Sequence, residues 1–288
     1  MSERVDIAVI GGSGLYRLGH LAEVERISVE TPFGAPSDEI VVGSMGGRRI
    51  AFLPRHGSRH RLAPAAVPYR ANIYALRVLG IRQIVSVSAV GSLVEQLRPG
   101  TLAVPDQLVD LTRSRAKTFF DDGCVAHVSP AEPWCSRLRA ALVAAGGGAR
   151  AVHDGGAYCC IDGPAFSTRA ESNLYRRWQL SMIGMTAAPE AVLAREANAC
   201  LAVLALITDY DCWRVGEAPV SADAVAEVMR RNVDAAQGVI AKLAVDCDEP
   251  ADCTCWHALD GAVLTDSSAL PASARERIEL FRTRRVGS

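Results

Sequence analysis

Short apolar runs alternate along this chain with longer stretches of helical periodicity. The runs have the length and β-branched content of buried strands, and they lie at residues 5–10, 40–42, 50–53, 84–88 and 201–207. Between them, apolar residues recur every three or four positions, which predicts helices at residues 67–79, 133–145, 189–199 and 225–243. Apart from a hairpin of the second and third runs, this rhythm indicates a largely parallel sheet covered by helices.

The organisation of the chain is that of one α/β domain. Residues 1–246 contain no internal repeat, low-complexity linker or sharp change of composition. Residues 247–288 are more polar and end in a basic stretch, which predicts a helix with a frayed terminus. We therefore interpret residues 247–288 as a C-terminal helical appendage and tail of the same domain.

Composition narrows the class of partner. The 288 residues are 49% hydrophobic, enough for a large core, and the 31 basic and 32 acidic side chains nearly cancel. This balance argues against recruitment of nucleic acid or an anionic membrane by net charge, and it favours a small-molecule ligand. No run of about 18 apolar residues and no signal-like N-terminus is present, so we expect a cytoplasmic enzyme without a membrane segment.

The nine cysteines are scattered through mostly apolar surroundings and are expected to be reduced core residues. Only Cys253 and Cys255 form a close pair with polar neighbours, and this spacing is not that of a usual zinc site. The sequence therefore predicts no metal. Whether Cys253 and Cys255 form a disulfide stays open.

The first predicted strand ends in Gly11-Gly12-Ser13-Gly14, a loop whose backbone N–H groups could hold an anion. The pattern fails three sharper tests. Arg17 stands where a dinucleotide fingerprint needs its third glycine, Leu15 stands where a hydrolase elbow needs its second, and the lysine of a Walker loop is absent. Dinucleotide enzymes, nucleotide triphosphatases and serine hydrolases are thus disfavoured.

Polar side chains follow several other predicted strands, at the edge where parallel sheets bind ligands. Arg55, His56, Ser88 and Thr186 could join Ser13 in a site for a dianion, because a guanidinium and hydroxyls together satisfy its oxygens. Taken singly, each could be a surface ion-pair residue or a strand cap. Asp209 and Asp211 follow the most apolar strand and could recognise or protonate a nitrogenous base, or simply cap the next turn.

At these positions the sequence resembles the 5′-methylthioadenosine phosphorylases of the trimeric purine nucleoside phosphorylase group. The matching motifs run in order over residues 5–245, at 11–15, 54–57, 69–73, 131–133, 166–172, 189–197 and 208–213. The resemblance implies a single-domain phosphorylase/hydrolase-like α/β fold with a central mixed, largely parallel sheet flanked by helices. It also implies phosphate-dependent cleavage of the N-glycosidic bond of a 5′-modified adenosine, giving adenine and a 5-modified ribose 1-phosphate.

The resemblance assigns two sets of ligand-binding residues. Inorganic phosphate, the co-substrate, would be bound by Ser13, Arg55, His56, Ser88, the backbone of Ala89, and Thr186. The nucleoside would contact Phe166, Ser167, Met185, Ala222 and Val225. No metal or organic cofactor is implied.

The remaining implied roles concern the base and the assembly. Asp209 would protonate the departing purine at N7, and Asp211 would hold the 6-amino group of adenine. His127 would reach the 5′ end of the nucleoside bound by a neighbouring subunit, which makes a homotrimer part of the site.

Two positions leave the identity of the 5′ substituent of the substrate undetermined. Ala222 and Ala226 stand where bulkier residues are usual near the 5′ group, so 5′-halo analogues as well as the methylthio compound are candidate substrates. A 6-oxopurine or methylthioinosine phosphorylase is the alternative enzyme, although two aspartates favour adenine. A non-catalytic nucleoside-binding protein is the alternative of another class.

Overall fold

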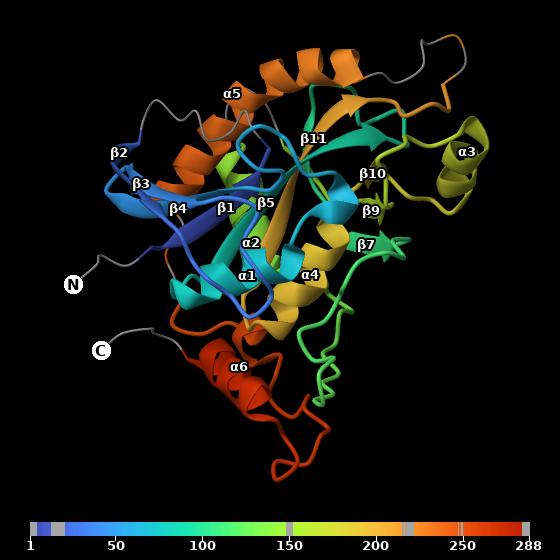
Figure 1. Cartoon of the computed structure of the whole chain (residues 1–288). Helices are drawn as coiled ribbons and strands as arrows, with labels where there is room; N and C mark the ends of the chain where they lie inside the picture. Colours follow the sequence, from blue (N-terminus) through green and yellow to red (C-terminus); the bar gives the residue numbers. More distant parts are fainter. Residues whose placement is uncertain are drawn as a thin grey trace.

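The chain folds around one branched β-sheet that carries helices on both faces (Figure 1). This computed structural model describes residues 5–12, 21–147, 152–214, 216, 222–246, 248 and 250–283. Ser13 and Cys247 lie outside the described residues, as does the side chain of Ala222. Within the described part of the chain, no helix is long and apolar enough to cross a bilayer.

The strands join in the order β2-β3-β4-β1-β5-β10-β9-β7, and β11 pairs with β5 and with β6, which in turn pairs with β8. Their bounds are β1 Ile7–Gly11, β2 Ala22–Ile27, β3 Ile40–Met45, β4 Arg48–Pro54, β5 Gln83–Ser92, β6 Leu102–Val104, β7 Gln107–Asp110, β8 His153–Asp154, β9 Ala157–Cys160, β10 Met182–Gly184 and β11 Cys200–Asp209. Parallel and antiparallel pairs are both present, and the parallel ones include the central pairs of β1 with β4, β1 with β5 and β11 with β5. The predicted mixed, largely parallel sheet is confirmed.

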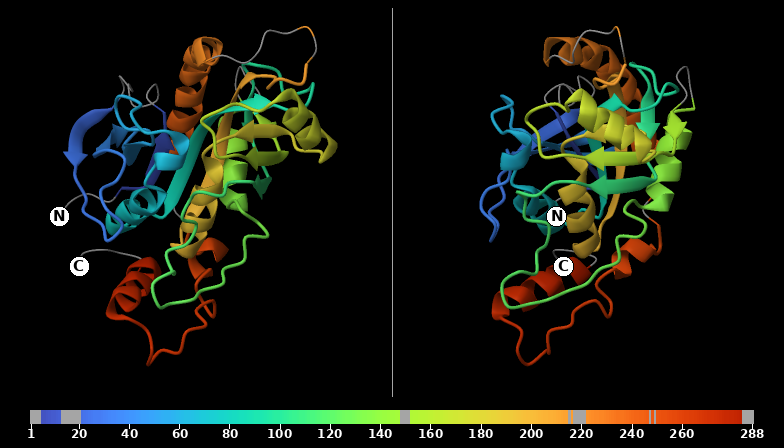
Figure 2. Two further views of the ribbon diagram at one scale, coloured as in Figure 1. Left: turned by 45° about the vertical axis from the view of Figure 1, so that its right-hand side comes forward. Right: turned by 90° about the vertical axis from the view of Figure 1, so that its right-hand side faces the viewer.

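Alternation along the strands builds two cores. On β1, Ala8 and Ile10 point into one cluster, while Ile7 and Val9 point into the other. The helices divide in the same way: α1, α4 and α6 pack on the first face, and α2 and α5 on the second (Figure 2). The helix bounds are α1 Tyr69–Val78, α2 Ser136–Ala145, α3 Arg169–Arg177, α4 Ala187–Glu196, α5 Ala222–Asp246 and α6 Ala272–Arg282, with short 3-10 turns at η1 Pro64–Ala66 and η2 Thr254–His257.

The sheet branches at β5, and this branch positions the site. β11 follows one edge of β5 from Gln83 to Gly91. On the other edge β1 pairs only with residues 84–86, and β10 pairs antiparallel with Gly91 and Ser92. Residues 87–90 therefore have no partner strand on that edge among the described strands, and they lie at a switch point of the kind where open α/β sheets bind ligands.

All the predicted helices and strands are present, but β2, β6, β7, β8, β9, β10 and α3 are absent from the prediction. Strands β6, β8 and β10 have two or three residues, too few for a hydrophobic period to be read. Helix α3 was also missed, although its start carries a capping box in which Thr168 and Glu171 bond each other's backbone N–H groups. Its mostly polar composition hides the apolar stripe that usually marks a helix.

The C-terminal segment is tied to the body of the protein. Ala126 pairs with Val263, so the excursion between β7 and α2 runs beside the segment that leads to α6 (Figures 1 and 2). Arg277 of α6 donates to the carbonyl of Phe119 and forms an ion pair with Asp122 at 2.9 Å. Through these contacts the appendage shares a core with α1 and α4.

Candidate functional site

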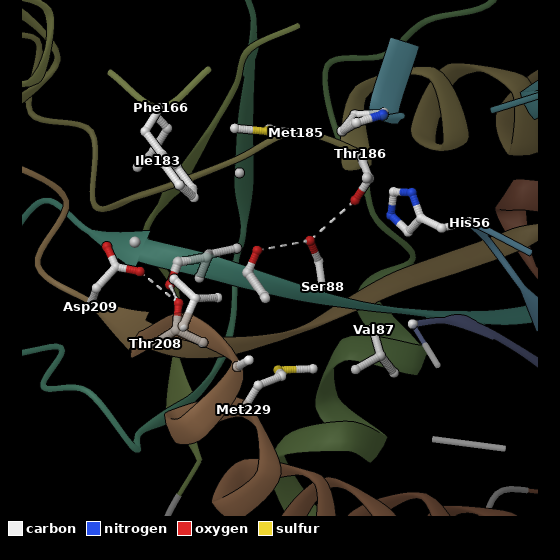
Figure 3. A pocket seen from close by; sticks show the side chains of 18 of the residues that line it. His56, Val87, Ser88, Phe166, Ile183, Met185, Thr186, Thr208, Asp209 and Met229 are labelled. Carbon is white, nitrogen blue, oxygen red and sulfur yellow. Dashed lines mark hydrogen bonds between the residues drawn. The ribbon is translucent and has the colours of Figure 1, made fainter. Parts of the chain in front are cut away.

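A cavity of about 550 Å³ opens where β5 lacks a partner strand. Its floor is the stretch Val87–Gly91 of β5, and its walls come from the ends of β1, β4, β10 and β11, the start of α4, the loop before α3 and the first turns of α5. Figure 3 shows Asp209 and Thr208 at one end and His56 and Thr186 at the other. The two ends have opposite chemistry.

Arg55 is held at the cavity by a buried ion pair with Glu190 of α4. Its Nε lies 2.5 Å from Glu190 Oε1, and Nη2 also contacts Oε2 and Ser86 Oγ. Nη1 donates to the carbonyl of Val87. Burial alone would lower the pKa of Arg55, but the adjacent Glu190 reverses this and raises it. Among these bonds only one Nη1 proton is left for a ligand, so Arg55 acts chiefly as a fixed, buried positive charge.

His56 follows Arg55 in the turn after β4. Its Nδ1 lies 2.8 Å from the carbonyl oxygen of Leu62, which can only accept, so Nδ1 carries a proton. Its ring stacks on His60 at 4.5 Å between centroids. Burial and the neighbouring charge of Arg55 lower the pKa of His56 to about 4. In the ligand-free protein at neutral pH, His56 is uncharged and presents Nε2 as an acceptor.

Two hydroxyls complete this end of the cavity. Ser88 Oγ lies 3.1 Å from Thr186 Oγ1 and 3.1 Å from the hydroxyl of Tyr158. Thr186 precedes the first residue of α4 but makes no side-chain cap bond to the helix. Its hydroxyl and the N-terminus of α4 therefore remain directed at the site, where the helix dipole favours an anion.

The opposite end contains Asp209 and Asp211, at the end of β11 and just beyond it. Asp209 accepts hydrogen bonds from Thr208 Oγ1 and from the backbone N–H of Asp211, both at 2.7 Å. Asp211 has φ of +53°, and its Oδ2 is buried without a hydrogen-bond partner among the described residues. Burial raises the pKa of both carboxyl groups, and the charge of Asp209 raises that of Asp211 further. Such carboxyl groups are poised to take or give a proton.

Apolar side chains line the space between the two ends. In Figure 3, Phe166, Ile183 and Met185 lie on one side and Met229 on the other. Phe166 lines the cavity and is 45% exposed, so part of its ring is open to contact with a ligand. This lining suits a flat ring system and a sugar.

The structure brings most of the predicted site residues to this one cavity. It is lined by Arg55, His56, Ser88, Ala89, Phe166, Ser167, Met185, Thr186, Asp209, Asp211 and Val225, and by Ala226, which was singled out for the 5′ pocket. The predictions for Ser13 and for the Ala222 side chain fall outside the described residues. His127 is exposed and does not line the cavity, and its backbone N–H donates to the carbonyl of Ala262.

Some residues of the site were not singled out from the sequence. Glu190 of α4 forms an ion pair with Arg55, and Tyr158 of β9 contacts Ser88. Arg115 donates to the carbonyl oxygens of Met185 and Asp162, so it fixes two loops that line the cavity. Glu190 lies in a motif that the resemblance includes, which is the one signal that could have found it.

Comparison with known proteins gives consistent matches. The sequence profile described as the phosphorylase superfamily matches residues 6–244. The chain is 53% identical to S-methyl-5′-thioadenosine phosphorylase of Geobacter sulfurreducens over 96% of its length and 97% of the relative's.

Solved structures agree. The fold is similar to that of a methylthioadenosine phosphorylase from an antarctic soil metagenomic library, with a TM-score of 0.91 at 48% identity, covering 96% of this chain and 99% of the other. A mutant adenosine/methylthioadenosine phosphorylase from Schistosoma mansoni, in complex with methylthioadenosine, has a TM-score of 0.79 at 36% identity, covering 84% and 91%.

Proposed function

Because this chain belongs to the phosphorylase superfamily, and within it to the S-methyl-5′-thioadenosine phosphorylases, we propose that it cleaves 5′-methylthioadenosine with inorganic phosphate. The products are adenine and 5-methylthioribose 1-phosphate. The observation that carries this proposal is the polarity of one cavity, which has a buried cation and hydroxyls at one end and two carboxyl groups at the other. In a nucleoside bound together with phosphate, the phosphate would lie at the cationic end, the sugar between the two ends and the base at the carboxyl groups.

Phosphate binds at the end formed by Arg55, His56, Ser88 and Thr186. The hydroxyls donate to phosphate oxygens, the N–H of Ala89 adds a backbone donor, and the buried charge of Arg55 attracts the anion. His56 is neutral in the free protein because of burial and Arg55. A bound dianion favours its charged form, and the Nε2 proton that His56 then gains points to the phosphate.

Cleavage makes one bond and breaks another. A phosphate oxygen forms a bond to C1′ of the sugar as the bond from C1′ to N9 breaks, and the electron pair of that bond moves onto the purine. The positive charge that builds on the sugar is stabilised by the phosphate dianion. A carboxyl proton neutralises the purine at N7. The phosphate supplies the nucleophile and the protein supplies the proton, so this scheme calls on no further cofactor.

The two aspartates have different roles at the purine base. Asp209 carries a raised pKa and is the proton donor to N7. Asp211, whose Oδ2 is buried and lacks a partner among the described residues, accepts from the 6-amino group of adenine. A 6-oxopurine would place a carbonyl oxygen against that carboxylate and be repelled, which favours 6-aminopurines over the alternative of a 6-oxopurine phosphorylase.

The 5′ group lies beside Val225, Ala226 and Met229 of α5. The small side chain of Ala226 leaves room there, so 5′-halo analogues of 5′-deoxyadenosine are accepted in addition to the methylthio compound. Comparing kcat/KM for methylthioadenosine, adenosine and a 5′-chloro analogue measures this preference. An exclusive preference for methylthioadenosine would contradict the broader substrate range.

We also propose a homotrimer in which His127 completes the site of a neighbouring subunit. This is supported by the position of His127, which is exposed and removed from the cavity of its own chain. Light scattering measures the assembly, and His127→Ala is expected to raise KM while the mass of the particle stays that of a trimer. A monomer with full activity would refute the shared site. A cytoplasmic location remains our prediction.

One assay tests the proposed reaction. The protein is incubated with methylthioadenosine with and without phosphate, and adenine and the sugar phosphate are quantified by chromatography. We expect adenine only when phosphate is present, in equal amount to the sugar phosphate. Equal adenine release without phosphate would identify a hydrolase, and no release under either condition would support a binding protein.

A further inference from the structure

A second cluster of titratable side chains lies away from the cavity. The sulfur atoms of Cys135, Cys200, Cys253 and Cys255 all lie within 4.8 Å of one another. Cys135 immediately precedes α2, Cys200 begins β11, and the other two flank the start of η2. Segments that are far apart in the sequence therefore converge on one point.

The dimensions of this cluster match a metal tetrathiolate. Zinc lies about 2.3 Å from each thiolate sulfur, so the sulfurs of a regular tetrahedron lie about 3.8 Å from one another. Here Cys135 Sγ is 3.8 Å and Cys200 Sγ is 3.4 Å from Cys253 Sγ. A disulfide needs about 2.05 Å between its two sulfurs.

We propose that Cys135, Cys200, Cys253 and Cys255 form a structural zinc site. Binding of Zn²⁺ releases the thiol protons to solvent and forms four Zn–S bonds, with no change of oxidation state. Four thiolates closed around one ion leave no open position, which is the arrangement of structural rather than catalytic zinc. The local spacing of Cys253 and Cys255 alone predicts no metal, and it is the fold that supplies the other two sulfurs.

The surroundings are organised as an outer shell. Arg195 of α4 donates from Nη1 to Cys255 Sγ at 3.3 Å, which stabilises negative charge on that sulfur. A tetrathiolate with Zn²⁺ carries two negative charges, so a nearby guanidinium is electrostatically favourable. Arg195 also donates to the carbonyl of Glu132, which fixes its position between the cluster and the segment before α2.

Backbone hydrogen bonds fix the positions of two of the four cysteines. The N–H of Cys135 donates to the carbonyl of Leu201, the residue after Cys200. The N–H of Cys200 donates to the carbonyl of Arg82, and the guanidinium of Arg82 lies 4.0 Å from the ring of Trp256. Three of the cysteines are buried and Cys253 is half-buried, so the cluster is largely shielded from solvent.

The site joins the C-terminal segment to the sheet at a point remote from catalysis. β11 begins at Cys200 and ends at Asp209, and nine steps of an extended chain span about 30 Å. Loss of the metal should therefore lower the stability of the region around η2 without a direct effect on substrate binding.

The first test is metal content. The protein is produced in zinc-supplemented medium, purified without metal-affinity steps and measured by inductively coupled plasma mass spectrometry. We expect one zinc ion per chain in the wild type and at least a tenfold lower content in the double variant Cys253→Ser/Cys255→Ser. The matched control is Cys124→Ser, a buried cysteine outside the cluster, which should keep its zinc.

A second set of measurements begins with the wild-type enzyme, so that its first result does not depend on the folding of a variant. A mercurial reagent added to the wild-type enzyme should release one zinc ion per chain to a chromogenic chelator. Arg195→Met should weaken zinc binding about 10- to 100-fold in a chelator competition. Replacement of zinc by cobalt should give the visible absorption of a tetrahedral cobalt thiolate.

Three outcomes would overturn the proposal. Four readily alkylated thiols with no bound metal would show a reduced cysteine cluster. Thiols that become reactive only after a disulfide reductant would show oxidised pairs. Iron in place of zinc would identify a different metal centre of the same ligand set.

Discussion

The two ends of β11 each gather buried titratable groups, but they do so in opposite ways. At its carboxyl end, Asp209 and Asp211 face a cavity, and Asp211 Oδ2 has no partner among the described residues. At its amino end, Cys200 Sγ lies 3.4 Å from Cys253 Sγ, and Arg195 donates a hydrogen bond to Cys255 Sγ of the same cluster. The first arrangement leaves polar groups for a substrate, and the second gathers four thiols that would be closed around the proposed zinc ion.

This difference separates catalytic from structural chemistry on one strand. A buried carboxyl group with a raised pKa costs folding free energy, which an enzyme recovers only when the substrate binds. A closed ligand set contributes free energy to folding. Substitutions at the two ends should therefore divide cleanly between activity and stability.

The largest expected effect is at Asp209. Asp209→Asn removes the proposed proton donor and should lower kcat/KM for methylthioadenosine about 10²- to 10⁴-fold. Burial raises the pKa of Asp209, so the folded protein holds this proton more tightly than the unfolded chain does. The free energy of unfolding therefore falls as the pH rises from the ordinary pKa of the carboxyl group towards the raised one. The amide removes this loss, so Tm at neutral pH should be unchanged or higher. Steady-state kinetics and differential scanning fluorimetry measure both.

Asp234→Asn on the exposed face of α5 is the matched control and should change neither quantity. If Asp209→Asn lowered Tm as much as activity, Asp209 would have a structural role and the contrast between the ends of β11 would fail.

The next effect concerns the ion pair below the phosphate end. Glu190→Gln leaves the buried guanidinium of Arg55 without its counter-charge and should cost about 3–5 kcal/mol in the free energy of unfolding. Urea denaturation measures this cost. Glu227→Gln, which removes an exposed helical ion pair with Arg231, should cost less than about 0.5 kcal/mol. A similar cost for both variants would mean that the buried pair is screened by solvent.

At the other end of β11, the effect should be on stability alone. Cys253→Ser should lower Tm by roughly 2–4 °C for each kcal/mol of lost metal binding, with KM for methylthioadenosine unchanged at moderate temperature. Thermal scans with and without added zinc, alongside initial rates, measure this. A large change in KM with no change in Tm would reverse the roles assigned to the two ends.

A smaller effect is expected on specificity. Ala226→Val narrows the space beside the 5′ group to the width usual in methylthioadenosine phosphorylases, so it should reduce kcat/KM for a bulkier 5′-propylthio analogue by about tenfold, with less effect on methylthioadenosine. Paired kinetics with the two substrates test this. Equal losses for both would show that Ala226 does not contact the 5′ group.

The smallest effect is a change in protonation. The pKa of His56 is about 4 in the free protein, so between this value and 6.5 the unfolded chain binds more protons and stability falls as the pH decreases. Phosphate should raise the pKa of His56 by about 1–3 units. Titration of histidine NMR signals with and without phosphate measures this shift, with the exposed His153 as an internal reference. An identical His56 titration in both samples would place phosphate elsewhere.

The sequence determined the long elements and most of the site. β5, β11, α1, α4 and α5 have clear hydrophobic periods, and their positions follow from local pattern. Arg55 and Asp209 could be found because each follows a strand-like run, and Ser88 because it ends such a run, since parallel strands end at one edge of the sheet. These predictions depend on information within a few residues of each position.

The tertiary structure decided what depends on contacts between distant residues. Residues 87–90 of β5 lack a partner on one edge because β1 pairs only up to residue 86 and β10 pairs only from Gly91 onwards. No local sequence pattern shows where the pairing of two strands ends. The pairing of Arg55 with Glu190 and the meeting of Cys135 and Cys200 with the C-terminal cysteines arise in the same way. Hydrophobic periodicity sets which face of an element is buried, whereas packing in three dimensions sets which buried groups meet.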